Sequence, residues 1–376
     1  MSKVESSPYL ASIPVYVPGK PIEEVAREFG LEPSSVIKLA SNENPLGPSP
    51  KALEAMQRVI RQLHLYPDGN AFYLKQKLAQ FLGVTPQHLS LGNGSNEILE
   101  FLGHAFLRPG DEVVVSQYCF AVYPIVAALF GATLVTVPAH GLAADIRAMI
   151  AAITPKTRML CLATPNNPTG TLASRDDIDR LLDEVPPHVL LVMDEAYVEF
   201  LDSPIDCLPF IRSGDRPNLV VTRTFSKIFG LAGLRLGYAI AVPDVIGHLE
   251  KVRQPFNLNA IAQAGALAAL EDHEHLARTK SNNREGLAYL ESSMTALGLP
   301  FIPSHANFVL AQVGDGLAVF RALQRKGIIT RPMGSYELPE WLRISVGTPE
   351  ENRRCIHALS EVLGKDLPQE FVNQVG

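Results

Sequence analysis

The middle of the chain alternates between short apolar runs and longer segments with helical spacing, and this alternation restricts the possible folds. The short runs are rich in valine, leucine and isoleucine, a composition typical of buried strands. They cover residues 112–116, 133–137, 158–163, 189–193, 219–222 and 237–241. Helical patterns at 96–107, 121–130 and 174–184 separate several of them. Strands connected through helices favour an α/β domain whose sheet is mainly parallel and flanked by helices.

The rest of the chain indicates a second, smaller domain. Ser49 followed by Pro50 is typical of a helix start, and we expect this helix to run to about residue 63. A long helical stretch covers about 259–297 with a break near Asp272, and strands are expected near 307–312 and 342–346. Because 376 residues exceed the usual size of a single core, two domains are expected. We predict a large domain at 41–265, and a small α+β domain from 1–40 and 266–376.

Composition indicates a globular protein and excludes several classes. The 33 basic and 39 acidic residues give a net charge of −6, which argues against a nucleic-acid surface. No apolar run is long enough to span a membrane, and residues 1–7 lack the apolar core of a signal peptide, so we expect a cytoplasmic protein. The cysteines are far apart and histidine spacing matches no metal site, so we expect free, mostly buried thiols and no metal.

Three segments in order along the chain carry candidate chemistry. They are residues 166–170 (Asn-Asn-Pro-Thr-Gly), 194–197 (Asp-Glu-Ala-Tyr) and 224–235 around Lys227. One lysine alone is most often a solvated surface charge. A lysine that can form a Schiff base, an acid that can pair with a pyridinium nitrogen and an arginine for a phosphate are together what a pyridoxal-phosphate site requires. The combination predicts Lys227 and Asp194 as catalytic residues.

Residues 92–97 (Gly-Asn-Gly-Ser-Asn-Glu) start like a dinucleotide-binding fingerprint, but Glu97 stands where the third glycine belongs. No first βαβ unit precedes the segment, which disfavours a nicotinamide enzyme. It does open a predicted helix, whose free N–H groups and dipole favour a phosphate, although a plain turn would look similar. Ser226 and Arg235 could bind the same phosphate. The candidate cofactor contacts in these segments are Gly94, Ser95, Asn96, Thr224, Ser226 and Arg235.

Other side chains are candidates for the ring of the cofactor. Asn167 and Tyr197 could hydrogen-bond its phenolic oxygen, and Tyr197 is therefore grouped with the catalytic residues. Phe120 could stack on the ring, although an ordinary core aromatic would look the same in the sequence. Lys227 would hold the cofactor covalently and later move the proton between substrate Cα and cofactor C4′.

These motifs resemble those of the class I and II aminotransferases, which have pyridoxal-phosphate fold type I. Over nearly its whole length the chain is most similar to the histidinol-phosphate aminotransferase family. The matching segments are 39–48, 66–69, 92–97, 166–170, 194–197, 223–235 and 342–347. That family often has tyrosine where this chain has Phe120, a change that preserves stacking.

The resemblance implies a homodimer with shared active sites, in which Tyr66 reaches the cofactor phosphate of the other subunit. It implies L-histidinol phosphate and glutamate or 2-oxoglutarate as substrates, and places Asn42 and Asn167 among the substrate-binding residues. Arg343 would bind the glutamate carboxylate, and Arg331 and Tyr16 would help bind the substrate phosphate.

Several alternatives share these motifs. An aromatic amino-acid aminotransferase fits because an imidazole pocket can take a phenyl ring, and a threonine-phosphate decarboxylase shares the scaffold. A pyridoxal-phosphate-dependent transcription regulator would need a winged-helix domain, for which residues 42–47 are expected to lie too near the start. A catalytically inactive binding module is disfavoured by the intact Lys227 and Asp194.

Overall fold

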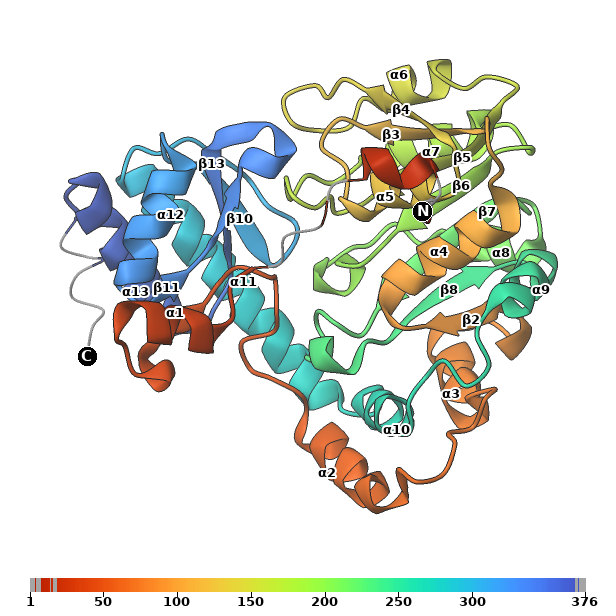
Figure 1. The fold of residues 1–376 in the computed structure, drawn as a ribbon, viewed down its shortest axis with the longest axis horizontal. Helices are drawn as coiled ribbons and strands as arrows, with labels where there is room; N and C mark the ends of the chain where they lie inside the picture. Colours follow the sequence, from red (N-terminus) through yellow and green to blue (C-terminus); the bar gives the residue numbers. More distant parts are fainter. Residues whose placement is uncertain (1–3, 5–7, 14, 16–18, 369–370, 372–376) are drawn as a thin grey trace.

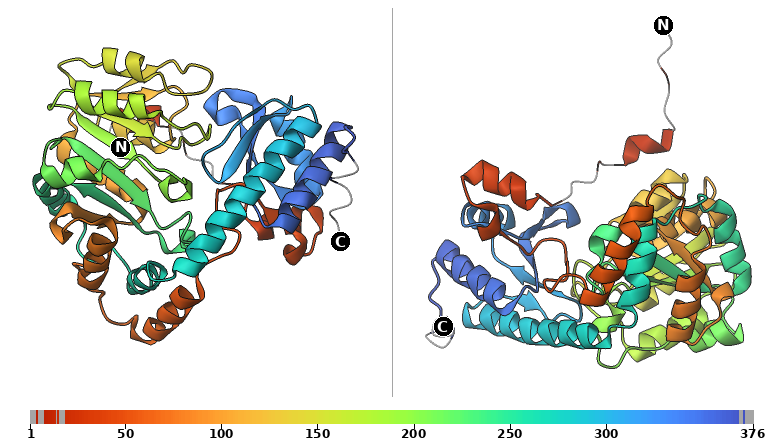
Figure 2. Two further views of the ribbon diagram at one scale, coloured as in Figure 1. Left: turned by 180° about the vertical axis from the view of Figure 1, so that it is seen from behind. Right: turned by 90° about the horizontal axis from the view of Figure 1, so that it is seen from below.

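The computed structural model describes residues 4, 8–13, 15, 19–368 and 371. Figure 1 shows a larger unit built around a twisted sheet and a smaller unit that combines the C-terminal part of the chain with the segment that contains residues 22–38. The first 3-10 segment, Pro8–Ser12, contacts the helix Val122–Leu129 of the larger unit. Helix α11 (His273–Ala296) runs between the two units, as the view from behind in Figure 2 also shows. No helix in the described part of the chain has the length and apolar character needed to cross a bilayer.

The large unit contains a seven-stranded sheet in the order β2-β8-β7-β6-β5-β3-β4. Its strands are β2 Leu89–Gly92, β3 Glu112–Ser116, β4 Thr133–Val137, β5 Thr157–Ala163, β6 Leu190–Asp194, β7 Leu219–Thr224 and β8 Gly237–Ala241. Strands β4, β3, β5, β6 and β7 pair in parallel, and β8 runs antiparallel to both of its neighbours. The prediction of a mainly parallel sheet is confirmed, and β2 is a strand that the sequence analysis did not assign.

Both faces of this sheet are buried, as the continuous apolar runs predict. Alternate residues of β5 and β6 pack in two separate cores: Leu160 and Leu191 in one, Met159 and Val192 in the other. Helices cover the two faces: α3 Phe72–Leu82, α4 Gly94–Phe106, α5 Val122–Leu129, α6 Ile146–Ala151, α7 Arg175–Glu184, α8 Leu208–Ser213, α9 Pro243–Val252 and α10 Ala260–Ala269.

Helix α2 (Pro50–Val59) starts where the sequence predicts. The Ser49 side chain accepts a hydrogen bond from the Ala52 backbone N–H, and proline occupies the first helical position. The helix ends at Val59 and passes into a short 3-10 turn, Ile60–Gln62, so the regular part is shorter than expected. The other 3-10 segments are Pro8–Ser12, Pro33–Ser35, Pro86–His88, Val198–Phe200, Ala232–Leu234 and Gly334–Tyr336.

The small unit is α+β. Its four-stranded sheet has the order β12-β13-β10-β9 and consists of β9 Phe301–Ile302, β10 Phe308–Gln312, β12 Arg331–Met333 and β13 Leu338–Ser345. Helices α12 Gly316–Arg325 and α13 Pro349–Leu363 complete it together with α11. From the N-terminal part, α1 Ile22–Phe29 packs on α12, and β1 Ile37–Lys38 pairs in parallel with β11 Ile328–Ile329.

The predicted break in the long helical stretch separates α10 from α11. Asp272 accepts a hydrogen bond from the His275 N–H and so starts the second helix. Ala266, Ala269 and Leu270 pack in the core of the large unit. We therefore propose the α10–α11 break as the boundary between the units, a few residues beyond the expected limit at 265.

Candidate active site

A cavity of about 180 Å³ lies where β5, β6 and β7 end, at the carboxyl edge of the sheet. Ligands of open α/β sheets bind at this edge. Its lining residues are Ser95, Asn96, Phe120, Ala163, Pro165, Asn167, Asp194, Ala196, Tyr197, Thr224, Ser226, Lys227 and Arg235. The structure thus brings together most of the cofactor-binding residues that the sequence predicts, from segments up to 140 positions apart (235 minus 95).

One end of the cavity has the character of an anion site. Helix α4 begins there at Gly94, which has φ +74°, and a Cβ atom at this position would lie 2.5 Å from an Arg235 guanidinium nitrogen. Arg235 Nη1 donates to Ser226 Oγ at 3.3 Å, and Thr224 Oγ1 donates to the same oxygen at 3.0 Å. A helix N-terminus, a guanidinium and hydroxyl groups that converge in this way fit a phosphate.

Asp194 has one satisfied and one unsatisfied oxygen. The side chain is only 3% exposed, and its Oδ2 accepts a hydrogen bond from Tyr123 Oη at 2.9 Å. Its Oδ1 is buried and accepts no hydrogen bond of ordinary geometry from any described residue. Burial raises the pKa of Asp194, whereas the Tyr123 hydrogen bond and the Lys227 charge act against that rise. A buried acceptor without a donor at the edge of a cavity fits the ring N–H of a pyridinium group.

Tyr123 is a site residue that the sequence analysis missed. It lies in the first turn of α5, three residues after Phe120, and the two rings meet edge to face with centroids 5.8 Å apart. The Tyr123 N–H donates to the Phe120 backbone oxygen at 3.1 Å, so a single turn joins the two residues at the start of the helix. Once Phe120 had been placed beside the cofactor ring, the spacing could have indicated Tyr123 as its neighbour.

Lys227 lines the cavity, and its surroundings favour the neutral amine more than those of an exposed lysine do. Its Nζ donates to the backbone oxygens of Ser41 and Asn42 at 3.3 Å and lies 5.5 Å from the centroid of the Tyr197 ring. Burial and then the charge of Arg343 lower the pKa of Lys227 to about 8. An amine must be neutral to act as a nucleophile or a base, so this environment suits both roles predicted for Lys227.

Tyr197 is held by Asn42 from the N-terminal part of the chain. Its hydroxyl accepts a hydrogen bond from Asn42 Nδ2 at 2.9 Å, and burial raises the pKa of Tyr197 to about 12. Asn42 has φ +55°, a conformation that asparagine tolerates better than most residues, and its N–H donates to Ser345 Oγ at 2.9 Å. Tyr197 is therefore a neutral hydroxyl in a fixed position.

A second cavity of about 140 Å³ shares Phe120, Asn167 and Lys227 with the first. Its remaining lining comes from the N-terminal part and the small unit: Gly19, Ala40, Ser41, Asn42, Arg331, Tyr336 and Arg343. The structure therefore brings together Asn42, Arg331 and Arg343, three of the predicted substrate-binding residues. Tyr336, in a turn between β12 and β13, carries no sequence signal that could have indicated it.

The two arginines lie on neighbouring strands, where Arg331 of β12 and Arg343 of β13 are direct cross-strand partners. Arg343 donates to the Asn167 side chain, and to the Ala40 backbone oxygen at 2.9 Å. Its guanidinium carbon lies 5.2 Å from the centroid of the Phe308 ring. Two guanidinium groups lining one cavity suit carboxylate or phosphate groups of a ligand.

Two predicted residues lie elsewhere. Tyr66 is 82% exposed, stacks on Phe256, and lines neither cavity of its own chain. Its assignment to the partner's site stays a prediction. Tyr16 lies outside the described residues. The four cysteines are buried and free, in keeping with the expected thiols.

The sheet, together with a buried lysine, a buried acid and an anion cradle at its carboxyl edge, defines a pyridoxal-phosphate enzyme of fold type I. The chain belongs to the aminotransferase class I and II family, whose sequence model matches residues 34–359. This confirms the transaminase class predicted from the sequence.

Individual relatives extend over nearly the whole chain. The histidinol-phosphate aminotransferase of Akkermansia muciniphila is 50% identical over 356 residues, which cover 94% of this chain and 98% of the relative. Histidinol-phosphate aminotransferase 2 of Ralstonia nicotianae is 50% identical over 363 residues, with coverage of 95% and 96%. The crystal structure of the Sinorhizobium meliloti histidinol-phosphate aminotransferase with pyridoxal-5'-phosphate aligns with a TM-score of 0.88 at 29% identity, covering 96% of this chain and 98% of that one.

Proposed function

We propose that this chain is a homodimeric, pyridoxal-phosphate-dependent aminotransferase that exchanges an amino group between L-histidinol phosphate and 2-oxoglutarate. The proposal depends on one observation: Arg331 and Arg343, which pair across neighbouring strands, line the same cavity as Lys227. One substrate carries a phosphate and the other carries carboxylates, and guanidinium groups bind both kinds of anion. The relatives of similar sequence support the choice of the phosphorylated substrate.

The large unit would hold the cofactor. Its phosphate would lie against the start of α4, Ser226 and Arg235, and its ring nitrogen would donate to Asp194 Oδ1. Asn167 and Tyr197 would hydrogen-bond the ring oxygen, and Phe120 would cover one face of the ring. When bound, the cofactor supplies an electron sink for the bond that breaks at substrate Cα.

The chain's own residues would control the proton. Lys227 would hold the cofactor covalently until substrate arrives, and its freed amine would then carry the proton between substrate Cα and cofactor C4′. The lowered pKa of about 8 leaves part of this amine neutral near neutral pH. Asp194 would keep the ring nitrogen protonated, and Arg343 would hold the substrate anion so that Cα lies within reach of Lys227.

The assignment to a homodimer is supported by an exposed apolar segment. Between residues 53 and 81 the large exposed apolar side chains are Leu53, Ile60, Leu63, Leu65, Tyr66, Phe72, Tyr73 and Phe81. This segment covers α2, α3 and the loop between them, which lie at one end of the large unit in Figure 1. Monomeric proteins rarely expose this much clustered apolar surface, so we infer that a second copy covers it.

The cytoplasmic location remains a prediction that cell fractionation can test.

Parallel turnover assays test the substrate. L-histidinol phosphate, phenylalanine and tyrosine would each be offered with 2-oxoglutarate, and we expect the largest kcat/KM for histidinol phosphate. A larger value for phenylalanine or tyrosine would establish the aromatic aminotransferase instead, which Phe120 and Tyr336 in the substrate cavity make the second candidate. Release of carbon dioxide from threonine phosphate would identify the decarboxylase.

Subunit mixing tests the shared site. Tyr66→Ala and Lys227→Ala homodimers should each be weakly active, and exchange of subunits should restore activity, because one site of each hybrid has both residues. A fully active monomer of 41.0 kDa at assay concentration would contradict this part of the proposal.

A further inference from the structure

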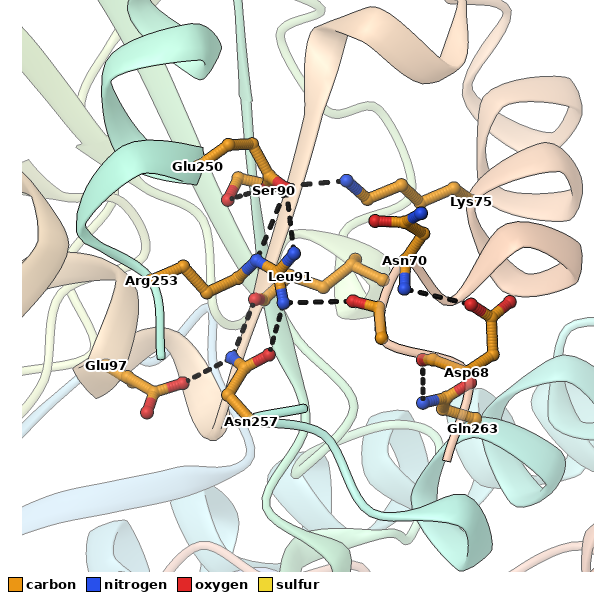
Figure 3. A network of polar contacts seen from close by, with 11 residues as sticks. Asp68, Asn70, Lys75, Ser90, Leu91, Glu97, Glu250, Arg253, Asn257 and Gln263 are labelled. Atoms are coloured by element: carbon orange, nitrogen blue, oxygen red, sulfur yellow. Dashed lines mark hydrogen bonds and ion pairs between the residues drawn. The ribbon is translucent and has the colours of Figure 1, made fainter. Parts of the chain in front are cut away.

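The turn at residues 253–257, between α9 and α10, contacts two segments that are far apart in the sequence (Figure 3). One is the start of α4, which forms the cradle for the phosphate in the same subunit. The other is the loop at residues 66–69, which carries Tyr66. None of the residues of this turn lines either cavity of the active site.

Asn257 holds the start of α4. Its Nδ2 donates to Glu97 Oε2 at 2.8 Å and to the Leu91 backbone oxygen at 3.1 Å, and its own backbone oxygen accepts from Asn93 Nδ2 at 2.8 Å. Glu97 Oε2 also accepts from the Asn93 N–H at 2.6 Å. These bonds hold Asn93 and Glu97, which flank the cavity-lining Ser95 and Asn96, so Asn257 supports the proposed cradle from outside the cavity.

Arg253 holds the Tyr66 loop to the same turn. Its Nη1 donates to the Gly69 backbone oxygen and to Asn257 Oδ1, both at 3.0 Å. Glu250 contacts the Arg253 guanidinium at 3.1 Å, and it also accepts from Ser90 Oγ at 2.7 Å. Arg253 therefore links the loop to the sheet and to the residue that supports the cradle.

Phe256 packs against the Tyr66 side chain. The two rings stack with centroids 4.8 Å apart and an angle of 28° between their planes. A Cβ atom on Gly69 would lie 3.2 Å from the Phe256 ring, so the loop is packed closely on it. A tyrosine that is 82% exposed would otherwise sample several rotamers. The stacking contact favours one of them in the single chain.

The backbone of Phe256 is in the left-handed region, with φ +57°. A bulky residue adopts this conformation rarely and at a cost, and such outliers persist where the surrounding contacts impose them. Here the conformation places the ring on Tyr66 while the next residue, Asn257, contacts Glu97. Phe256 thus connects the ring contact with Tyr66 to the hydrogen bonds that Asn257 makes.

We propose that this turn positions residues of two active sites at once: Asn257 shapes the phosphate cradle of its own subunit, and Phe256 aims Tyr66 at the cofactor phosphate of the partner. Both are positioning residues, since neither lines the cofactor cavity. The proposal rests on the proposed function through the shared site. Asn257 would act on the cofactor site of its own subunit, whereas Phe256 would act on the site of the partner subunit.

Hybrid dimers in which only one subunit keeps Lys227 distinguish the effect within a subunit from the effect across the interface. One subunit carries Lys227→Ala and the other keeps Lys227, and the readout is the dissociation constant of the pyridoxal phosphate that borohydride can fix to the intact subunit. Phe256→Gly on the Lys227→Ala subunit should weaken this binding about tenfold, whereas the same substitution on the intact subunit should leave it unchanged. Asn257→Ala should show the reverse pattern.

Three controls keep the result specific. Phe256→Gly removes the ring without straining the backbone, because glycine adopts positive φ freely, and thermal unfolding of the hybrids should confirm an unchanged fold. Phe256→Tyr keeps a ring for stacking and should bind cofactor as the parent does. In a chain that already carries Tyr66→Ala, Phe256→Gly should have no further effect, because its action passes through Tyr66.

Each possible result of the hybrid-dimer experiment tests a separate part of the proposal. Equal losses from both placements of Phe256→Gly, or of Asn257→Ala, would show a general structural effect and overturn the positioning roles. If Tyr66→Ala on the Lys227→Ala subunit leaves the intact site unaffected, the shared site of the proposed function is wrong. If Tyr66→Ala weakens binding but Phe256→Gly does not, the shared site stands and the role of Phe256 is overturned.

Discussion

The proposed cofactor half of the active site, around Lys227 and Asp194, and the proposed substrate half, around Arg331 and Arg343, differ in where their residues come from. The cofactor half belongs to the large unit, where Asp194 and Thr224 end adjacent strands and Lys227 follows closely. The substrate half combines the N-terminal segment with the small unit, represented by Asn42 and Arg343. One half is therefore built on a single sheet, whereas the other depends on the contact between two units.

We expect the cofactor half to determine the reaction and the substrate half to determine which substrate is accepted. In the cofactor half, Asp194 is fixed by a buried contact within the large unit, the hydrogen bond from Tyr123. Arg343 instead contacts Asn167 of the large unit and Ala40 of the N-terminal segment. A shift of the small unit would move Arg331 and Arg343 and leave Asp194 in place. The fold thus allows substrate preference to change while the reaction stays the same.

The largest expected effect comes from Asp194→Ala in the cofactor half. Without the carboxylate the ring nitrogen loses its proton, and an unprotonated pyridine is a poor electron sink, so the chemical rate should fall by several orders of magnitude. Single-turnover kinetics on cofactor-loaded protein measure this, and thermal unfolding serves as the control for folding. Substantial turnover by a folded, loaded variant would contradict the role of Asp194.

In the substrate half, Arg343→Ala should impair both half-reactions. Arg331→Ala should impair the histidinol-phosphate half more than the glutamate half, because Arg331 is assigned to the phosphate. Loss of one partner of a desolvated, charge-assisted contact costs about 2–5 kcal/mol, which appears as a drop in kcat/KM. Single-turnover measurements of each half-reaction separate the two arginines. Equal losses for phosphorylated and unphosphorylated substrates in Arg331→Ala would show that it does not recognise phosphate.

Tyr123→Phe should have a smaller effect, because it removes a hydrogen bond and leaves the ring in place. Hydrogen bonds to charged groups contribute about 1.5–3 kcal/mol, so we expect the chemical rate to fall about tenfold. The Tyr123 bond holds down the pKa of Asp194, and its loss should raise that pKa. Since the proposed role of Asp194 requires the carboxylate form, the acidic limb of the rate profile should move to higher pH. An unchanged profile would show that Tyr123 does not tune Asp194.

The smallest effect concerns the stability of the cofactor-free protein. The pKa of Lys227 is about 8 in the fold and about 10.4 in an unfolded chain. Between these values the unfolded chain carries a proton that the folded chain lacks, so the free energy of unfolding should rise with pH. The rise should be about 1 kcal/mol between pH 8 and 9 and should be absent in Lys227→Met. Thermal unfolding of both proteins across this range provides the comparison.

Local sequence signals predicted much of the large unit. The expected ranges 112–116, 133–137 and 237–241 coincide with β3, β4 and β8, because apolar runs of strand length and their flanking turns are local properties. Most of the residues proposed to bind the cofactor line one cavity, and sequence could group them because they lie in short segments at strand ends.

Contacts between distant segments could not be predicted in this way. The positive φ of Phe256 and its stacking on Tyr66 depend on packing between segments 190 positions apart (256 minus 66), and the sequence around Phe256 gives no sign of either. The cross-strand pairing of Arg331 with Arg343 depends on the register of β12 and β13. Sequence could name these arginines by resemblance, but only the fold shows that they are neighbours.

The unpaired Oδ1 of Asp194 and the buried amine of Lys227 also bear on the life of the protein in a cell. We expect each to lower the stability of the empty fold, and in the proposed function each bonds to the cofactor. A ligand that binds only the folded state stabilises it by mass action. The empty chain should therefore unfold more often and be removed sooner by proteases. We expect the amount of enzyme in the cell, as well as its activity, to follow the supply of the cofactor.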